Sequence, residues 1–173
     1  MGNFFAKSGF LIFSKFYDII KIKKGEIKMN PKYDYNPENN CAICIITGEG
    51  GTKYYGRAYC HPDDKEFASE KTGLTIAELR AQIEFLTDYK NKLTIEYKAL
   101  KQLYYSINLS KKFNEKSYEA KALKRHMKMK EYDIVIASAT LKETKQALRN
   151  FISAKEGFYK KIRKLRAEKE GQE

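Results

Sequence analysis

The stretch LTIAELRAQIEFLTDYKNKLTIEYKALKQLYYSIN, from Leu74 to Asn108, decides the fold. Apolar or tyrosine side chains return along it every three or four residues, as on the contact face of a coiled-coil helix. Thr75 and Glu78 stand at the spacing of a capping box, which marks a helix start. We therefore expect one long helix over 74–108. Eight of the nine positions on its contact face are apolar or tyrosine: Leu79, Ile83, Leu86, Lys90, Leu93, Tyr97, Leu100, Tyr104 and Ile107.

A second face of this kind follows a polar connection and predicts another helix over 114–168. Its middle, 134–139, is apolar nearly all round, which indicates burial on several sides. Gly157 is a candidate for a kink in this helix. The contact face comprises Ala120, Leu123, Met127, Lys130, Ile134, Ala137, Leu141, Thr144, Leu148, Phe151, Lys155, Phe158, Ile162 and Leu165.

The two expected helices differ in length. At about 1.5 Å per residue they span roughly 50 Å and roughly 80 Å, so an antiparallel pair leaves roughly 30 Å of the second helix uncovered. That part carries the apolar side chains of Leu148, Phe151, Phe158, Ile162 and Leu165. An exposed apolar stripe of this size needs a partner, and a second copy of the chain is the simplest one. We expect a homo-oligomer, a dimer or higher.

Upstream of the helices the pattern becomes that of β-strands. Cys41–Thr47 and 52–60 are β-prone, and the turn Gly48-Glu49-Gly50-Gly51 separates them, which predicts a β-hairpin over 41–64. Gly56 inside the second strand indicates a bulge or a close approach of another backbone. The segment 29–40 (MNPKYDYNPENN) is polar and is expected to be an extended lead-in.

The expected fold class is α+β and mostly α. A β-hairpin head is followed by two long antiparallel helices that form a coiled-coil-like body, and 41–173 make a single domain. Two interpretations stay open for 1–28: an amphipathic surface helix over Phe4–Ile22, or a mis-annotated extension with the true start at Met29. Lys15 and Asp18 interrupt the apolar run there, so we expect no membrane span.

The charge is unevenly distributed along the 173 residues, whose formal net charge is +12. Residues 1–85 hold 12 basic and 11 acidic side chains, whereas 86–173 hold 22 basic and 11 acidic ones. A basic half indicates an anionic partner such as a nucleotide or a nucleic acid, although solvated lysines on a helix surface explain the same pattern.

Candidate metal and catalytic groups are few. Cys41, Cys44, Cys60 and His61 have the count of a Cys3His zinc site, a weak alternative to cysteines that pack as small hydrophobic side chains. Strand parity favours packing, because Cys41 and Cys44 are three residues apart and face opposite sides of a regular strand. No glycine-rich phosphate loop leads into a helix, and no nucleophile–histidine arrangement is present. We expect a non-enzyme without a cofactor, and three cysteines without an export signal favour the cytoplasm.

Aromatic, amide and cationic residues are better candidates for ligand binding. Arg57 lies on the hairpin, and Arg80 lies in the first turns of the first long helix. Such groups can stack a base, read its edge and hold phosphates. Each residue also has a structural interpretation: Tyr104 is a contact-face position, and Asn114 can cap the second helix. The candidates at the connection between the helices are Tyr104, Tyr105, Asn114, Lys124 and Arg125.

Two stretches carry a resemblance to small proteins of Firmicute phages and prophages. They are GRAYCHPDD at 56–64, continued by TGLTIA at 72–77 with Arg80 and Ala81, and SKKFNEKSYEA at 110–120. Among phage proteins with a β-hairpin front and two long helices, the layout resembles the type 1 Thoeris anti-defence family. That resemblance implies an oligomeric sponge that encloses a cyclic nucleotide signal, such as a cyclic ADP-ribose isomer, in the host cytoplasm. By position, Tyr104 or Tyr105, Asn114 and Arg125 would surround the ligand.

The resulting expectation is a phage- or prophage-encoded anti-defence protein that sequesters a small cyclic nucleotide without catalysis. The alternative is a basic coiled-coil protein of a mobile element that binds nucleic acid or inhibits a defence protein. A small-molecule pocket and a long nucleic acid are distinguished by the salt dependence of binding, which is steep when many lysines contact phosphates.

Overall fold

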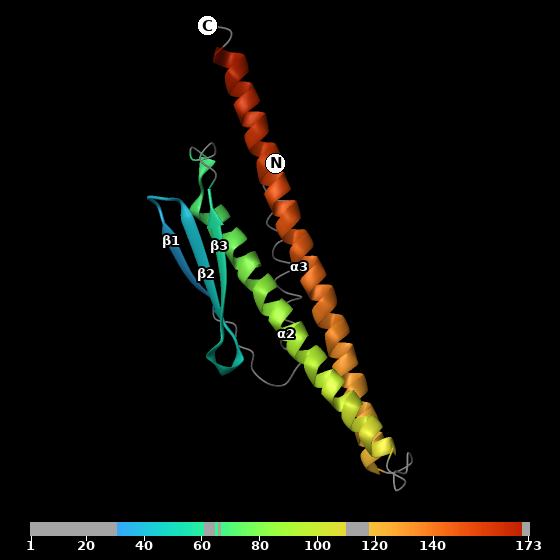
Figure 1. Cartoon of the computed structure of the whole chain (residues 1–173). Coiled ribbons are helices and arrows are strands. Elements are labelled where there is room, and N and C mark those ends of the chain that lie inside the picture. Colours follow the sequence, from blue (N-terminus) through green and yellow to red (C-terminus); the bar gives the residue numbers. More distant parts are fainter. Residues whose placement is uncertain (1–30, 61–64, 66, 110–117, 171–173) are drawn as a thin grey trace. The chain divides into compact units, whose positions relative to one another are not determined.

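The computed structural model describes residues 31–60, 65, 67–109 and 118–170. It confirms the fold class, an α+β chain that is mostly helical, with strands first and two long helices after them (Figure 1). The strands are β1 (Lys32–Asn36), β2 (Cys41–Thr47) and β3 (Lys53–Tyr59), and the helices are α2 (Glu70–Leu109) and α3 (Tyr118–Glu170). In the described part of the chain, neither helix carries a run long and apolar enough to cross a bilayer.

The sheet has three antiparallel strands in the order β1-β2-β3, one more than the expected hairpin. The predicted pair is present, with Cys41 opposite Tyr59 and Thr47 opposite Lys53. The turn between them forms a short 3-10 helix, Glu49–Gly51, in which Gly50 and Gly51 take the positive φ angles that glycine adopts without strain. The additional strand lies in the segment expected as an extended lead-in, where Lys32–Asn36 pair with β2 as β1.

Helix α2 begins earlier than the sequence predicts. It starts at Glu70, and the hydroxyl of Thr75 donates a hydrogen bond to the carbonyl of Lys71 inside the helix, so Thr75 is not its N-cap. Gly73 lies within the helix at a contact with β2, where an added Cβ would come within 3.0 Å of the Cβ of Ala42. The close packing on the sheet explains why a residue that usually interrupts helices is tolerated here.

Contacts divide the chain into two compact units, each described by itself. Unit 1 comprises 1–85 and 143–173, and unit 2 comprises 86–142. Unit 1 contains the whole described sheet, the first sixteen residues of α2 and the second part of α3. The prediction of a single domain over 41–173 stays a prediction.

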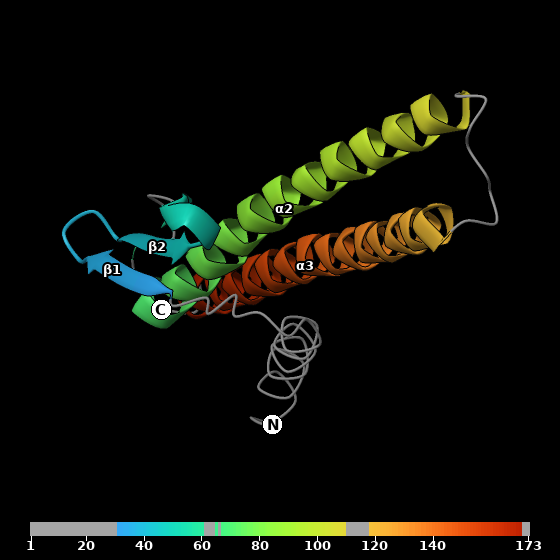
Figure 2. The ribbon, with the colours of Figure 1, turned by 90° about the horizontal axis from the view of Figure 1, so that it is seen from below.

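The core of unit 1 lies between the sheet and the start of α2, which run alongside each other in both ribbon views (Figure 2). Gly56 on β3 lets α2 approach very closely, since an added Cβ would overlap the carbonyl oxygen of Ala77. The close backbone approach predicted at Gly56 is therefore confirmed. The side chains buried around it are Ala42, Cys44, Ile46, Tyr54, Ala58, Ala77, Leu79, Ala81 and Phe85.

Unit 2 is an antiparallel pair formed by the second part of α2 and the first part of α3. Lys130 forms an ion pair with Glu96, and the ammonium of Lys124 lies 5.4 Å from the centre of the Tyr104 ring. The contact positions Leu93, Ala120 and Ala137 are buried as predicted. Val135 is 61 % exposed, so the expected burial of 134–139 on several sides is not complete within the chain.

More of the end of α3 is covered by other residues of the chain than the helix lengths predict. The ring of Tyr159 stacks on that of Phe67, with 5.1 Å between centroids, and Leu148, Phe151 and Ile162 are half-buried. Phe158 and Leu165 remain more than half exposed. Helix α3 continues through Gly157 without interruption. The homo-oligomer stays a prediction, and it now depends on a smaller apolar surface.

Candidate functional site

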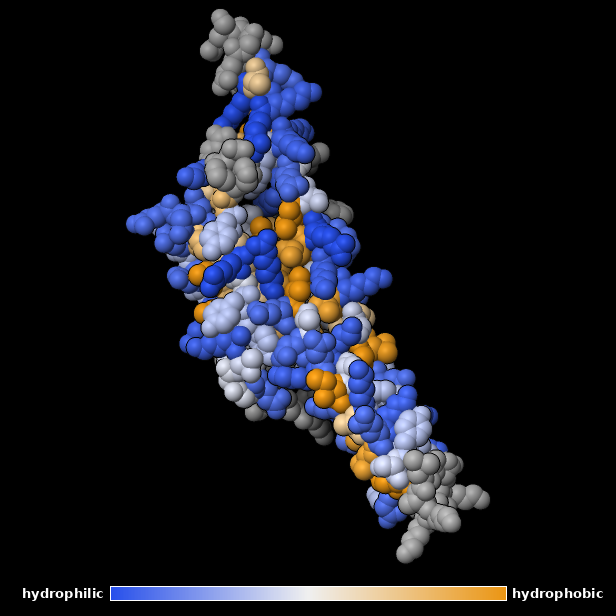
Figure 3. Space-filling view, in the orientation of Figure 1, coloured by the Kyte–Doolittle hydropathy of each residue, from blue (hydrophilic) through white to orange (hydrophobic). Residues whose placement is uncertain are grey.

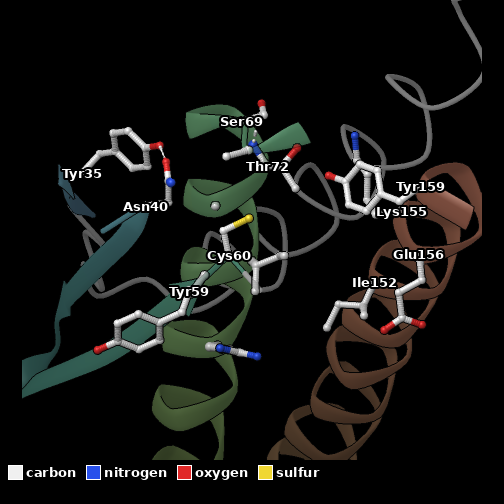
Figure 4. A pocket seen from close by; sticks show the side chains of 15 residues that line it. Tyr35, Asn40, Tyr59, Cys60, Ser69, Thr72, Ile152, Lys155, Glu156 and Tyr159 are labelled. Atoms are coloured by element: carbon white, nitrogen blue, oxygen red, sulfur yellow. Dashed lines mark hydrogen bonds between the residues drawn. The ribbon is translucent and has the colours of Figure 1, made fainter. Parts of the chain in front are cut away.

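A cavity of about 220 Å³ lies in unit 1, between the sheet, the start of α2 and the second part of α3 (Figure 4). Four segments meet around it, and the first and the last of them are more than a hundred residues apart in the sequence. Its lining is Tyr35, Asn40, Ala58, Tyr59, Cys60, Ala68, Ser69, Thr72, Gly73, Ile76, Arg80, Ile152, Lys155, Glu156 and Tyr159. This is the candidate binding site.

The wall formed by the sheet depends on the turn between β1 and β2. Asn40 has a φ of 49°, in the left-handed region that asparagine tolerates better than most residues. Its side-chain oxygen accepts a hydrogen bond from the hydroxyl of Tyr35 at 2.8 Å, and its carbonyl accepts one from the amide of Cys60 at 3.3 Å. Asn40 thereby holds the ends of β1 and β3 together beside the cavity.

The wall formed by α2 contains hydroxyl groups and a guanidinium. Ser69 precedes the helix, and its hydroxyl accepts a hydrogen bond from the amide of Thr72. Two turns on, Arg80 donates from its guanidinium to the carbonyl of Arg57 on β3. Arg80 is therefore held beside the cavity by a backbone group, with donors left over for a ligand, since a guanidinium carries five N–H groups.

The wall formed by α3 adds one residue of each charge. Ile152, Lys155, Glu156 and Tyr159 project from successive turns toward the start of α2 (Figure 4). The ammonium of Lys155 lies 5.7 Å from the ring centre of Phe151, and Tyr159 donates a hydrogen bond to the carbonyl of Phe67 at 3.5 Å. With Arg80, the charged lining comprises two cations and one anion.

Two titratable groups of the cavity are held in their neutral forms. Burial raises the pKa of the Cys60 thiol, although Lys65 lowers it in part. Burial also raises the pKa of the Tyr159 phenol, and Cys60 raises it further. A neutral thiol and a neutral phenol are poor nucleophiles and poor bases, and both can take part in hydrogen bonds.

The proposed zinc ligands are distributed as strand parity predicts. Cys44 faces α2 with Ala42 and Ile46, whereas Cys41 belongs to the opposite face of β2. Burial and the nearby Glu78 carboxylate raise the pKa of Cys44 to about 12, which disfavours the thiolate that binds metal. His61 lies outside the described residues, and among those described no three His, Cys, Asp or Glu side chains are grouped to hold a metal ion.

The structure brings the sequence-predicted binding residues together only in part. Arg57 and Arg80 lie in unit 1, joined through the backbone of Arg57. In unit 2, Lys124 lies over Tyr104, and Tyr104 contacts Tyr105 edge to face at 6.1 Å. Arg125 is exposed on α3, and Asn114 lies outside the described residues. Among the members of this set that the structure describes, only Arg80 lines the cavity.

Sequence reasoning missed most of the cavity lining. Tyr35 and Asn40 fall in the segment expected as a lead-in, and Lys155 is one of the expected contact-face positions of the second helix. The lysine at a contact-face position was the available signal, because a charged side chain in an apolar row indicates either a snorkelling stem or a site.

The comparisons with known proteins leave the site to be interpreted from its geometry. The sequence matches no protein-family model, and no similar curated protein or solved structure was found.

A pH-dependent stability is expected from Glu78, which lies on α2 beneath the sheet. Burial raises the pKa of this carboxyl above its usual 4.5, although hydrogen bonds from Tyr33 and Gln82 lower it in part. The folded protein then binds the proton more tightly than the unfolded chain, so stability falls as the pH rises from about 4.5 through the folded-state pKa. At pH values above the folded-state pKa, the ionised carboxylate lowers the free energy of unfolding by a constant amount.

The substitution Glu78→Gln removes the titrating group and keeps an oxygen that accepts these hydrogen bonds. We expect the variant to be more stable than the wild type at pH 7 and equally stable below pH 4.5. Urea unfolding at a series of pH values measures the difference. An identical pH dependence of the two proteins would show that Glu78 does not titrate in this way.

Proposed function

We propose that this protein binds a small anionic nucleotide without changing it chemically, and that the cavity of unit 1 is the binding site. One observation carries the proposal: the cavity combines two cationic side chains, Arg80 and Lys155, with the hydroxyls of Ser69 and Thr72 at the start of a helix. Guanidinium, ammonium and hydroxyl groups are the donors that phosphates take in proteins, and a helix start favours negative charge.

The size of the cavity limits the ligand. Sites for drug-sized molecules have volumes of about 300–1,000 Å³, and this cavity has about 220 Å³. It therefore accommodates a phosphate with an attached sugar, or one mononucleotide, rather than a whole dinucleotide. A larger cyclic nucleotide would have to extend past Tyr59, whose side chain points away from α3 at the edge of the site (Figure 4).

Binding without catalysis is supported by the state of the cavity's reactive groups. Burial raises the pKa of Cys60 and of Tyr159, which disfavours the ionised, nucleophilic form of both groups. Together with the sequence resemblance, this favours sequestration: a phage- or prophage-encoded anti-defence protein, acting in the host cytoplasm, would lower the free concentration of a cyclic nucleotide signal by holding it.

Calorimetry with cyclic AMP and with cyclic ADP-ribose tests the proposal. The substitution Lys155→Ala removes one charge-assisted hydrogen bond, worth about 1.5–3 kcal/mol, so we expect a loss of affinity of tenfold or more. Lys145→Ala is the matched control, because Lys145 lies exposed on the same part of α3 but does not line the cavity.

A third variant separates the two candidate places for the ligand. Arg125→Ala should leave affinity unchanged if the cavity binds the nucleotide. If Arg125→Ala abolishes binding and Lys155→Ala does not, the ligand belongs at the Tyr104–Lys124 cluster of unit 2 and the cavity assignment is wrong. No heat with either nucleotide would contradict the proposed function itself.

The alternative function, nucleic-acid binding by a basic helical body, is favoured by the charge of α3. This helix holds 15 basic and seven acidic residues, and its last turns expose Lys160, Lys161 and Lys164. A duplex bound there would lose affinity steeply with salt, whereas a single nucleotide in a cavity would not. Titration of a short DNA duplex at two salt concentrations distinguishes the two functions.

A further inference from the structure

The sheet has one face that no helix covers among the described residues. α2 packs against the face that carries Cys44, Ile46 and Gly56. Because paired residues of antiparallel strands point to the same side, the register defines the opposite, outer face. Its central rows are Lys32, Ile45 and Tyr55; Asp34, Ile43 and Arg57; and Asn36, Cys41 and Tyr59.

The outer face presents aromatic rings and a guanidinium in one line along β3. Tyr55 is 46 % exposed, Tyr59 is 64 % exposed, and Arg57 between them is exposed as well. Ile43 and Ile45, half-buried on β2, form an apolar floor beside that line. Over the strands, Figure 3 shows pale and orange atoms among blue ones rather than a uniform hydrophilic surface.

The line of side chains rests on a strand that is fixed at its outer edge. Glu84 of α2 accepts a hydrogen bond from the amide of Tyr55 at 2.6 Å, and Arg80 donates to the carbonyl of Arg57. One backbone group on the free edge of β3 is thus occupied at each of these two residues, the amide of Tyr55 and the carbonyl of Arg57. The close approach at Gly56 holds the same strand from below. Tyr55, Arg57 and Tyr59 are therefore presented by a rigid support.

We propose that the outer face of the sheet binds single-stranded nucleic acid. At about 3.4 Å per residue, Arg57 lies about 7 Å from Tyr55 along the strand, and Tyr59 lies about 14 Å from it. Consecutive stacked bases of a duplex strand are about 3.4 Å apart, so only an unstacked, extended strand matches this spacing. Bases stack on exposed tyrosines, and the guanidinium between them contacts a phosphate or stacks on a base.

The charges on this face agree with a polyanion as the occupant. Lys32, Lys53 and Arg57 oppose a single carboxylate, Asp34, which leaves a net charge of +2 on the face. A second copy of the chain is less suitable, because lysine and aspartate are depleted at the centres of protein–protein interfaces, and Lys32, Lys53 and Asp34 all lie on this face. Pairing of the outer faces of two copies of the chain is the competing interpretation, and the experiment below distinguishes it from nucleic-acid binding.

Fluorescence anisotropy with a short labelled oligothymidylate tests the proposal on the full chain. Stacking contributes about 1–3 kcal/mol per base, so Tyr55→Ala should weaken binding by about tenfold or more. Tyr55→Phe keeps the ring and should keep the affinity within about twofold. Tyr132→Ala is the matched control: Tyr132 is 65 % exposed on α3, in unit 2, and should not matter.

The readouts separate this inference from the proposed function. Tyr55 does not line the cavity, so Tyr55→Ala should leave calorimetric binding of cyclic nucleotides unchanged. The proposal is overturned if Tyr55→Ala binds oligothymidylate like the wild type, if Tyr132→Ala loses as much, or if a duplex of the same length binds as tightly and with the same dependence on Tyr55. It is also overturned if Tyr55→Ala abolishes only self-association in analytical ultracentrifugation.

Discussion

The substitution Gly56→Ala is expected to separate the sheet from α2 and to destabilise the protein by about 3 kcal/mol. The added methyl group would overlap the carbonyl oxygen of Ala77 and come within 2.5 Å of the backbone nitrogen of Ala81. Both neighbours are backbone atoms, so no change of rotamer relieves the overlap and the helix must move. Urea unfolding monitored by circular dichroism measures the loss.

A second glycine supplies the control. Gly157 lies on an exposed part of α3, and nothing lies within 4 Å of the Cβ that alanine would add there. Gly157→Ala should raise stability by about 0.5–1 kcal/mol, because alanine has the higher helix propensity. If both substitutions changed stability equally, the contact between Gly56 and α2 would not have the tightness described.

The contact at Gly56 could be predicted from the local sequence only in part. A glycine inside an otherwise regular strand predicts a bulge or a close approach, and the close approach is present. The sequence did not identify the approaching segment, because Ala77 and Ala81 carry no distinctive signal. They are small residues on the face of α2 that meets β3, and alanine is common in helices for reasons of propensity alone.

The start of α2 and strand β1 were missed for a related reason. Thr72-Gly73 has the form of a break, and only the contact of Gly73 with Ala42 shows why the helix continues through it. In β1 the alternation is limited to Tyr33 and Tyr35, whose hydrogen-bond partners lie outside the strand: Tyr33 donates to the distant Glu78, and Tyr35 donates to Asn40 in the turn that follows. Tertiary contacts override local preference in both cases.

The long helices were predictable because their pattern repeats over many turns. The candidate site was not, because its lining comes from four segments whose small members, such as Ala58, Ala68 and Gly73, have no chemical signal. Tyr104 and Lys124 flank a single connection, so their proximity follows from the chain order. Arg80 and Lys155 are 75 residues apart, and nothing local in the sequence indicates that they line one cavity.

The interior of the sheet offers the other large expected effect. Ile46 is 1 % exposed and is among the largest fully buried side chains, whereas the neighbouring Ile45 is half-buried on the outer face. Ile46→Ala should destabilise the protein by about 3 kcal/mol, since removing a buried isoleucine loses its transfer free energy and leaves a cavity.

Ile45→Ala removes the same atoms from the other side of β2, so it provides the matched comparison for Ile46→Ala. Its side chain keeps contact with water, and we expect a loss of about 1 kcal/mol. Chemical denaturation of the two variants at one pH gives the difference directly. Because a shift of one residue in strand register would exchange the two positions, a larger loss for Ile45→Ala than for Ile46→Ala would contradict the register of β2 and, with it, the assignment of Tyr55, Arg57 and Tyr59 to the outer face.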